Sequence, residues 1–191
     1  MMFTDFKKEE GFTLIEIIVV IAIFSILMGG LLSLYDWHSK VYLLERADTQ
    51  ATGSARIALN NMTKYIAQGS QILTSRTINS TTYTTGTTTV VLQLPSFDSS
   101  GNLIANTNDY VVYYLSGSSL YQLISVGSSS SSRTPGTKIM SADVHSLSLT
   151  YNNSDVTQAS TVSVDLQTQV TTRGSSNVSA HLSDTIFLRN F

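Results

Sequence analysis

One carboxylate, Glu16, lies near the start of a long apolar run in the sequence KKEEGFTLIEIIVVIAIFSILMGGLLSLY. A charge within the apolar zone of a membrane is unfavourable, so this position predicts a partner for the carboxylate. Cleavage between Gly11 and Phe12 would create one, because Phe12 would then carry a free α-ammonium four residues before Glu16. This spacing places both charges on one face of a helix, where they can neutralise each other within a chain or between neighbouring chains.

Little else in the sequence has the pattern of a reactive site. The three histidines, His38, His145 and His181, are scattered without an H-E-x-x-H motif, and there is no cysteine to act as a nucleophile or metal ligand. The chain also lacks a G-x-S-x-G motif and a glycine-rich phosphate loop. We therefore expect no enzymatic activity, no metal site and no cofactor.

Two weaker patterns have ordinary explanations that we prefer. The residues Asp98, Ser100, Asn102 and Asp109 are spaced as in a degenerate calcium loop, but the turn glycine is displaced and the final bidentate glutamate is missing. A polar loop explains them better. Four tyrosines could form an adhesive surface, although aromatic residues in strands more often belong to the core or to cross-strand pairs; they are Tyr110, Tyr113, Tyr114 and Tyr121.

The apolar run is long enough to cross a membrane as a helix. Between Phe12 and Leu34, Glu16 is the only ionisable group, and about 20 apolar residues suffice for a span. Lys7 and Lys8 precede the run and no basic residue follows before Lys40, which predicts a cytoplasmic N-terminus and an external C-terminus. A plain anchor, or a secretory signal peptide removed near Gly29–Gly30, would share this hydropathy.

Helical periodicity continues beyond the span, and strands follow it. A helix is predicted from about Leu14 to Gln68, with Gly29–Gly30 as a weak point, because small and apolar residues recur at steps of three and four up to Ile66. Six later segments have strand patterns: TTVVLQL, DYVVYYL, SLYQLISV, VHSLSLTY, STVSVDLQTQV and VSAHLSDTIFL. A hairpin is expected around Ser116–Ser118, and PSFDSSGN, Ser128–Gly136 and NNSD are expected to be loops. This order predicts an α+β fold in which one long helix packs on an antiparallel sheet.

Length and charge limit the remaining possibilities. With 191 residues, the chain can form one domain plus an anchor. Its formal net charge is −2 and no cluster of Lys or Arg follows Lys7 and Lys8, so no nucleic-acid partner is expected.

The segment EEGFTLIEIIVVIAIFSIL resembles the class III signal of type IV prepilins and type II secretion pseudopilins. The resemblance implies that a membrane-bound prepilin peptidase cleaves after Gly11 and N-methylates Phe12. It also implies that Glu16 guides assembly into a filament. The other matching residues are Lys7 and Lys8 as the basic leader, and Thr13, Leu14 and Ile15 as the start that the peptidase recognises. With Phe12, these three residues also belong to the segment that is expected to take part in filament assembly.

Two departures from the family pattern bear on processing by the peptidase and on the type of subunit, respectively. Acidic Glu9 and Glu10 directly precede Gly11, and Ser33 stands where many major pilins have a helix-bending proline. The segments ARIALNNMTKYIAQGSQI and TIFLRNF are also similar to J-type pseudopilins and W-type minor pilins. The resemblance therefore favours a minor pilin or pseudopilin, with a major pilin as the alternative.

The implied organisation has four parts: a leader at 1–11, a transmembrane and filament-core helix at 12–34, an amphipathic helix at 35–70 and a β-rich extracytoplasmic domain at 71–191. Expected partners are prepilin peptidase, other pilin or pseudopilin subunits, an inner-membrane assembly platform and the lipid bilayer. The subunit would be a single-pass protein of the cytoplasmic membrane before assembly and part of an extracytoplasmic filament or the cell surface afterwards. A competing hypothesis of another class is a Sec-secreted adhesin or ligand-binding β-domain.

Overall fold

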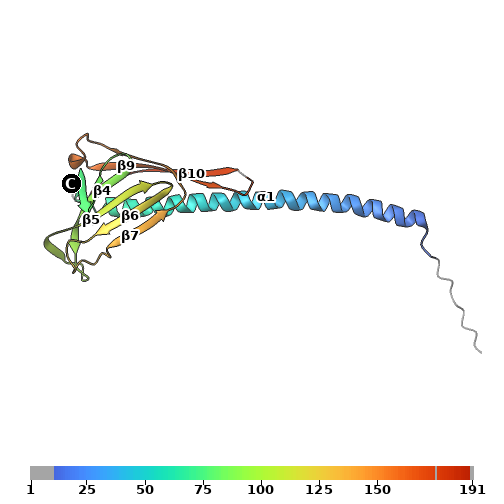
Figure 1. Ribbon diagram of the computed structural model, residues 1–191, viewed down its shortest axis with the longest axis horizontal. Helices are drawn as coiled ribbons and strands as arrows, with labels where there is room; N and C mark the ends of the chain where they lie inside the picture. Colours follow the sequence, from blue (N-terminus) through green and yellow to red (C-terminus); the bar gives the residue numbers. More distant parts are fainter. Residues whose placement is uncertain (1–10, 175, 190–191) are drawn as a thin grey trace, which may run out of the picture. The chain divides into compact units, whose positions relative to one another are not determined.

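The structure is a computed structural model, and it describes residues 11–174 and 176–189. One helix, α1, runs from Leu14 to Ile66 and is followed by ten strands (Figure 1). The contacts divide the chain into two units at Leu43/Leu44. The first unit contains the apolar part of α1, and the second contains the rest of α1 with all strands.

The strands form three antiparallel sheets. The five-stranded sheet has the order β1-β4-β5-β6-β7, and the three-stranded sheet has the order β10-β9-β8. Strands β2 and β3 form a separate hairpin. The bounds are β1 Gln71–Leu73, β2 Ser75–Ile78, β3 Thr81–Thr84, β4 Thr89–Phe97, β5 Leu103–Ser116, β6 Ser119–Ser125, β7 Gly136–Ser141, β8 Val144–Tyr151, β9 Thr161–Thr171 and β10 Asn177–Phe187, with a short 3₁₀ helix at Val156–Gln158.

The second half of α1 packs on these sheets through a stripe of small and apolar residues. Four alanines are followed by two larger residues near the end of the helix; the stripe consists of Ala47, Ala51, Ala55, Ala58, Met62 and Ile66. Their spacing of three and four residues places them on one face of the helix. The α+β prediction is therefore confirmed, and the predicted helix end lies two residues beyond the observed one.

Both large sheets share one core with this part of α1. In β9, Val162, Val164 and Leu166 are buried in that core while the residues between them face outward, as the alternation predicts. Thr168, the next inward residue, is also buried, and its hydroxyl donates to the carbonyl oxygen of Ala51 at 2.8 Å. The polar end of β9 is thus bound directly to α1.

The small β2–β3 hairpin covers the opposite face of the five-stranded sheet. Ile78 of β2 and Tyr83 of β3 pack with Val91, Val112 and Leu123 in a second apolar cluster. The hairpin turn is made by Asn79 and Ser80, which have φ values of 48° and 65°. Positive φ at both central residues is typical of the type I′ turn that fits the twist of two paired strands.

Two predictions about the strands need correction. The four strands β1, β2, β3 and β7 were not predicted, because they are short and bury few residues, so they lack a clear alternation. Pro95–Phe97, predicted to be loop, continues β4 through a register shift between Pro95 and Phe97. A β-bulge tolerates proline because one amide there is released from the ladder. The hairpin at Gly117–Ser118 and the other loops are as predicted.

Candidate functional site

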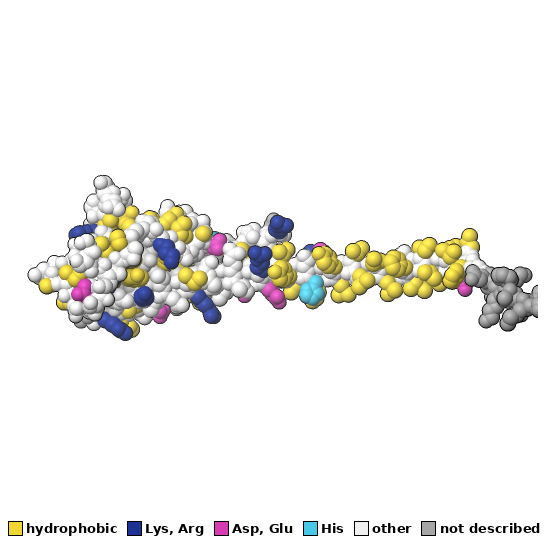
Figure 2. Space-filling view, turned by 90° about the horizontal axis from the view of Figure 1, so that it is seen from below, with side chains coloured by type: hydrophobic (Ala, Val, Ile, Leu, Met, Phe, Trp, Pro, Cys, Tyr) yellow, Lys and Arg dark blue, Asp and Glu magenta, His cyan; other side chains and the backbone are white. Residues whose placement is uncertain are grey.

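The apolar part of α1 is exposed on all sides. Between Phe12 and Leu34, the large apolar side chains are 44–85% exposed. An 18-residue window of α1 has a mean hydropathy of 2.8, and none of it is buried, so by length and composition the helix could cross a membrane. Figure 2 shows these hydrophobic side chains along the visible face. A helix that is apolar all round requires a lipid or protein environment that a single chain does not provide.

The predicted cleavage site lies just before this helix. Gly11 and Phe12 are exposed and precede the first helical residue, Leu14. The first helical hydrogen bond joins the amide of Ile17 to the carbonyl of Thr13 at 3.3 Å, so the Gly11–Phe12 peptide bond is outside the helical ladder. A peptidase can therefore reach this bond without unwinding α1. Lys7 and Lys8 lie outside the described residues.

Glu16 has a partner in the uncut chain, and it is Thr13. The Glu16 carboxylate accepts hydrogen bonds from the Thr13 amide at 2.9 Å and from the Thr13 hydroxyl at 3.0 Å. The amide of Glu16 lies 3.3 Å from the Thr13 hydroxyl oxygen. This reciprocal arrangement is a capping box, with Thr13 as N-cap and Glu16 three residues later. It satisfies two amide groups that the helix start would otherwise leave without a partner.

The capping box changes the interpretation of Glu16. The prediction sought a partner only in the α-ammonium that cleavage creates, yet the pattern T-x-x-E ahead of an apolar run was visible in the sequence. The cap also holds the carboxylate beside the helix N-terminus, where the helix dipole favours a negative charge. The amide nitrogen that cleavage would turn into an ammonium belongs to the residue next to Thr13. Leu14 and Ile15, the other predicted recognition residues, are exposed in the first turn.

Of the four residues of the degenerate calcium loop, Asp98, Ser100 and Asn102 share one loop, whereas Asp109 has other partners. Asp98 closes its own loop, where its carboxylate accepts hydrogen bonds from the amides of Ser100 and Asn102. Asp109 is buried in β5 and binds other partners. Among residues 11–174 and 176–189, no group of three or more acidic or histidine side chains could hold a metal ion.

The tyrosines divide between the two faces of the five-stranded sheet. Tyr113 is buried, its hydroxyl lies 2.6 Å from the side-chain oxygen of Asn61, and it accepts a hydrogen bond from Gln122 at 2.9 Å. Burial raises the pKa of Tyr113, which keeps the hydroxyl neutral. On the other face Tyr114 and Tyr121 stack with ring centroids 5.1 Å apart. The preferred interpretation, core and cross-strand pairs, is confirmed for these three tyrosines.

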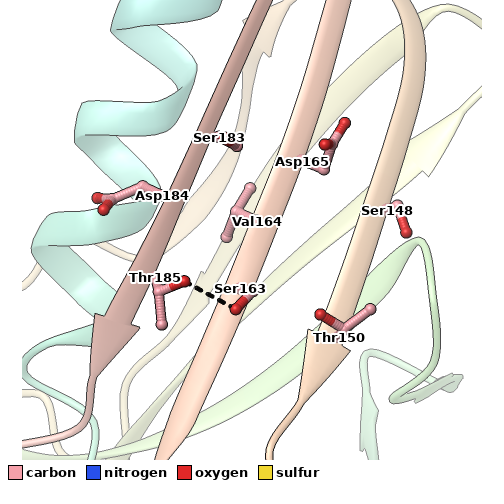
Figure 3. A pocket seen from close by; sticks show the side chains of 8 residues that line it. All are labelled: Ser148, Thr150, Ser163, Val164, Asp165, Ser183, Asp184 and Thr185. Atoms are coloured by element: carbon pink, nitrogen blue, oxygen red, sulfur yellow. Dashed lines mark hydrogen bonds between the residues drawn. The ribbon is translucent and has the colours of Figure 1, made fainter.

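A hollow on the three-stranded sheet is lined mainly by hydroxyl groups (Figure 3). Ser163 and Thr185 are hydrogen-bonded to each other at 2.9 Å, and Asp184 points toward α1, where the Thr63 hydroxyl donates to it. The nearby His181 contacts Asp165 at 2.9 Å. In the part of the chain that the structure describes, no serine or threonine hydroxyl is hydrogen-bonded to His181.

Sequence reasoning missed a buried ion pair. The carboxylate of Asp109, with no exposed side-chain surface, lies 2.7 Å from the Arg133 guanidinium. It also accepts hydrogen bonds from Ser96, Ser131 and the amide of Gly127. Arg133 in turn donates to the Pro95 carbonyl and to Gln68, two residues after the end of α1. One carboxylate thus connects the β6–β7 loop to β4, β5 and the end of α1.

Gly127 in this loop can only be glycine. A Cβ added there would collide with the carbonyl oxygen of Asn108 and with Thr107. The close approach of the two backbones lets the Gly127 amide reach Asp109.

Acid is expected to weaken the folded domain through Asp109. Burial raises the pKa of this carboxyl, but the hydrogen bonds from Ser96, Ser131, Arg133 and Gly127 outweigh it and the net pKa is lowered. A lowered pKa in the folded state stabilises the protein above the ordinary aspartate value of about 3.9, and this stabilisation is lost as the pH falls below it.

Urea unfolding between neutral pH and about pH 2.5 should show this loss as a falling midpoint. Hydrogen bonds from Asn102 to Asp98 and from Thr157 to Asp155 lower those pKa values too. We therefore compare how steeply the urea midpoint falls with pH in the wild type and in Asp109→Asn. The fall should be shallower in the variant, and the difference is the contribution of Asp109 to the acid sensitivity. Equal slopes would contradict the prediction.

Comparison with known proteins bears on the N-terminal segment. Residues 6–32 match a family model described as the prokaryotic N-terminal methylation motif. No protein of curated function matches the chain closely. The motif is found in structural pilin subunits rather than enzymes, and a long helix packed on antiparallel sheets is consistent with the type IV pilin-like fold. The N-terminal segment of this chain is therefore a type IV pilin-like class III signal peptide, as carried by precursors of pilins and pseudopilins.

Proposed function

We propose that the chain is a minor pilin or pseudopilin of a type IV pilus-like or type II secretion filament. Prepilin peptidase cleaves it after Gly11 and methylates Phe12, and the subunit assembles with other pilins through its apolar helix and Glu16. The observation that carries the proposal is the exposure of every large apolar side chain between Phe12 and Leu34, in the segment that the methylation motif at residues 6–32 largely covers. Such a helix suits a bilayer first and a bundle of identical helices later.

The geometry of Glu16 supports a role in both settings. Before cleavage the capping box gives the carboxylate hydrogen bonds inside its own chain. After cleavage the ammonium of Phe12, or of a neighbouring subunit, supplies the opposite charge that assembly requires. Small residues along the helix, among them Ala22, Ser25 and Gly29, allow close approach of neighbouring helices.

Two sequence features favour a minor subunit over a major one. Ser33 replaces the helix-bending proline, and its hydroxyl donates to the carbonyl of Gly29 at 2.9 Å within an uninterrupted helix. The segments similar to J-type pseudopilins and W-type minor pilins point the same way. In the membrane the subunit would have its N-terminus in the cytoplasm, since Lys7 and Lys8 precede the span.

The first test is the mature N-terminus. Mass spectrometry of the purified mature protein should find a chain beginning with N-methylated Phe12. The variant Gly11→Val should remain uncut, and because a Cβ at Gly11 meets nothing within 4 Å, any loss of cleavage reflects recognition by the peptidase rather than misfolding.

A mature chain that begins near Gly30 would sink the proposal in favour of a secreted β-domain. Abundance separates the two types of subunit: a minor pilin should be scarce in sheared filaments. A near-stoichiometric amount would support the major-pilin alternative instead.

A further inference from the structure

Three exposed aromatic side chains follow directly after the apolar run. Tyr35, Trp37 and Tyr42 are 76%, 63% and 61% exposed. All three belong to the first unit of the chain, which ends at Leu43. Aromatic residues with a polar edge are enriched where a membrane meets water, because the ring prefers the acyl chains and the polar edge prefers the headgroups.

The three aromatic residues surround the helix rather than forming a stripe. At about 100° per residue, Tyr35 and Tyr42 lie on the same side of α1, and Trp37 lies nearly opposite them. Leu34, His38 and Ser39 complete a shallow hollow with the two tyrosines on their side. A contact with one neighbouring subunit would gather aromatic residues on one face, whereas a lipid interface contacts the helix from every side.

Charged residues appear at the same level along α1 as the three aromatic residues. Asp36 and Lys40 form an exposed ion pair at 2.7 Å, and Asp36 is the first acidic residue after Glu16. Charges are unfavourable within the acyl chains and are well solvated among the headgroups. The boundary between apolar and polar surroundings therefore falls just after Leu34.

The distance along the helix agrees with the thickness of a bilayer. From Leu14 to Leu34, at about 1.5 Å per residue, the helix is about 30 Å long, and the hydrocarbon core is about 30 Å thick. With the aromatic residues at the outer boundary, the Thr13–Glu16 capping box falls at the inner one, where water and headgroups solvate the carboxylate.

We propose that Tyr35, Trp37 and Tyr42 form an interfacial anchor that binds the headgroup boundary of the outer leaflet and fixes the depth of α1 before assembly. This inference rests on the proposed function for its biological setting. The anchor holds the Gly11–Phe12 bond at the opposite membrane surface, within reach of a membrane-bound peptidase. Assembly must then withdraw three aromatic side chains from the interface, so the anchor also opposes extraction of the subunit.

Trp37 is the sole tryptophan of the chain, so its fluorescence measures the depth of the anchor directly. The full-length uncut chain is placed in vesicles of phosphatidylcholine and phosphatidylglycerol that carry bromine at different positions along the acyl chain. We expect bromine near the carbonyl end to quench Trp37 more strongly than bromine near the methyl end. Emission should also shift to shorter wavelength than in the urea-unfolded chain.

Phe24→Trp in a Trp37→Phe background is the matched reference for the membrane centre, and it should show the opposite order of quenching. Replacing Tyr35 and Tyr42 together by serine should increase quenching of Trp37 by iodide in the water phase. The variant Ser39→Ala, at the same height, should not.

Two results would overturn the anchor. One is that bromine at the methyl end quenches Trp37 most strongly. The other is that bromine does not quench Trp37 at all, although it quenches the tryptophan of the Phe24→Trp variant. The second result would assign the aromatic residues to contacts between subunits. The bromine and iodide quenching measurements use the uncut chain, so they are independent of processing. Failure of cleavage at Gly11 would sink the proposed function and leave the measured depth of Trp37 unchanged.

Discussion

Glu16→Ala is expected to give a subunit that is inserted and cleaved but is nearly absent from filaments. The substitution removes the charge that is to meet the Phe12 ammonium of a neighbouring chain, and without it the ammonium enters the filament core unpaired. An unpaired charge in an apolar setting is strongly unfavourable. Quantifying the subunit in sheared filaments and in the membrane fraction measures the effect, and mass spectrometry of the membrane fraction checks cleavage.

Two further variants separate the charge of Glu16 from its role in the helix cap. Glu16→Gln keeps a side chain that can complete a capping box but has no charge, so it should fail to assemble as alanine does. Thr13→Val removes the hydroxyl that contacts Glu16 at 3.0 Å and keeps the carboxylate. Once mass spectrometry has shown that this variant is cleaved, it should still assemble. Assembly of Glu16→Gln at the wild-type level would show that hydrogen bonding, rather than charge, is what matters.

The site could be predicted in part because its key signal is local. A lone carboxylate in an apolar run is visible without a structure, and so is the cleavage junction before it. The capping box is an equally local pattern, since Thr13 and Glu16 are three residues apart, but the prediction of a charged partner for Glu16 does not include it. The roles of Gly11, Phe12 and Glu16 in processing and assembly remain predictions.

The fold could be predicted wherever a segment buries a regular face. The alanine stripe of α1 and the alternation in β9 both reflect one-sided burial, and both elements were predicted. The β2–β3 hairpin buries Ile78 but leaves the other three residues of β2 exposed, so its position depends on the sheet that it covers. A short strand stabilised by distant residues carries no signal of its own.

Asp109 shows more clearly that contacts between distant residues leave no local pattern in the sequence. In the sequence it is one polar residue among others near a loop, and the nearest pattern suggested a calcium ligand. In the structure its charged partner, Arg133, is 24 residues away and lies beyond another strand. Only the pairing of β5 with β4 and β6 brings these residues together. The β6–β7 loop, which has no regular structure, is held by hydrogen bonds to this buried carboxylate and by those that Ser132 and Arg133 donate to the carbonyls of Phe97 and Pro95.

Asp109→Asn is therefore expected to cause the largest loss of stability among single substitutions at polar residues. The amide removes the charge that balances Arg133, whose side chain is only 11% exposed. Removing one partner of a buried ion pair costs about 3–5 kcal/mol, because the other charge is left without compensation. Urea unfolding of the full chain in mild detergent, followed by near-ultraviolet circular dichroism of the tyrosines, measures the change in free energy.

Asp48→Asn is the matched control, since Asp48 is exposed on α1 and asparagine and aspartate have similar helix propensities. The double variant Asp109→Asn/Arg133→Met should lose less than the sum of the two single losses, because the second substitution removes the charge that the first one strands. A single Asp109→Asn loss no larger than that of Asp48→Asn would mean that the hydrogen bonds from Ser96, Ser131 and Gly127 hold the loop without the charge. The loop would then owe its order to neutral hydrogen bonds, and the acid sensitivity expected for this domain would have to come from other carboxylates.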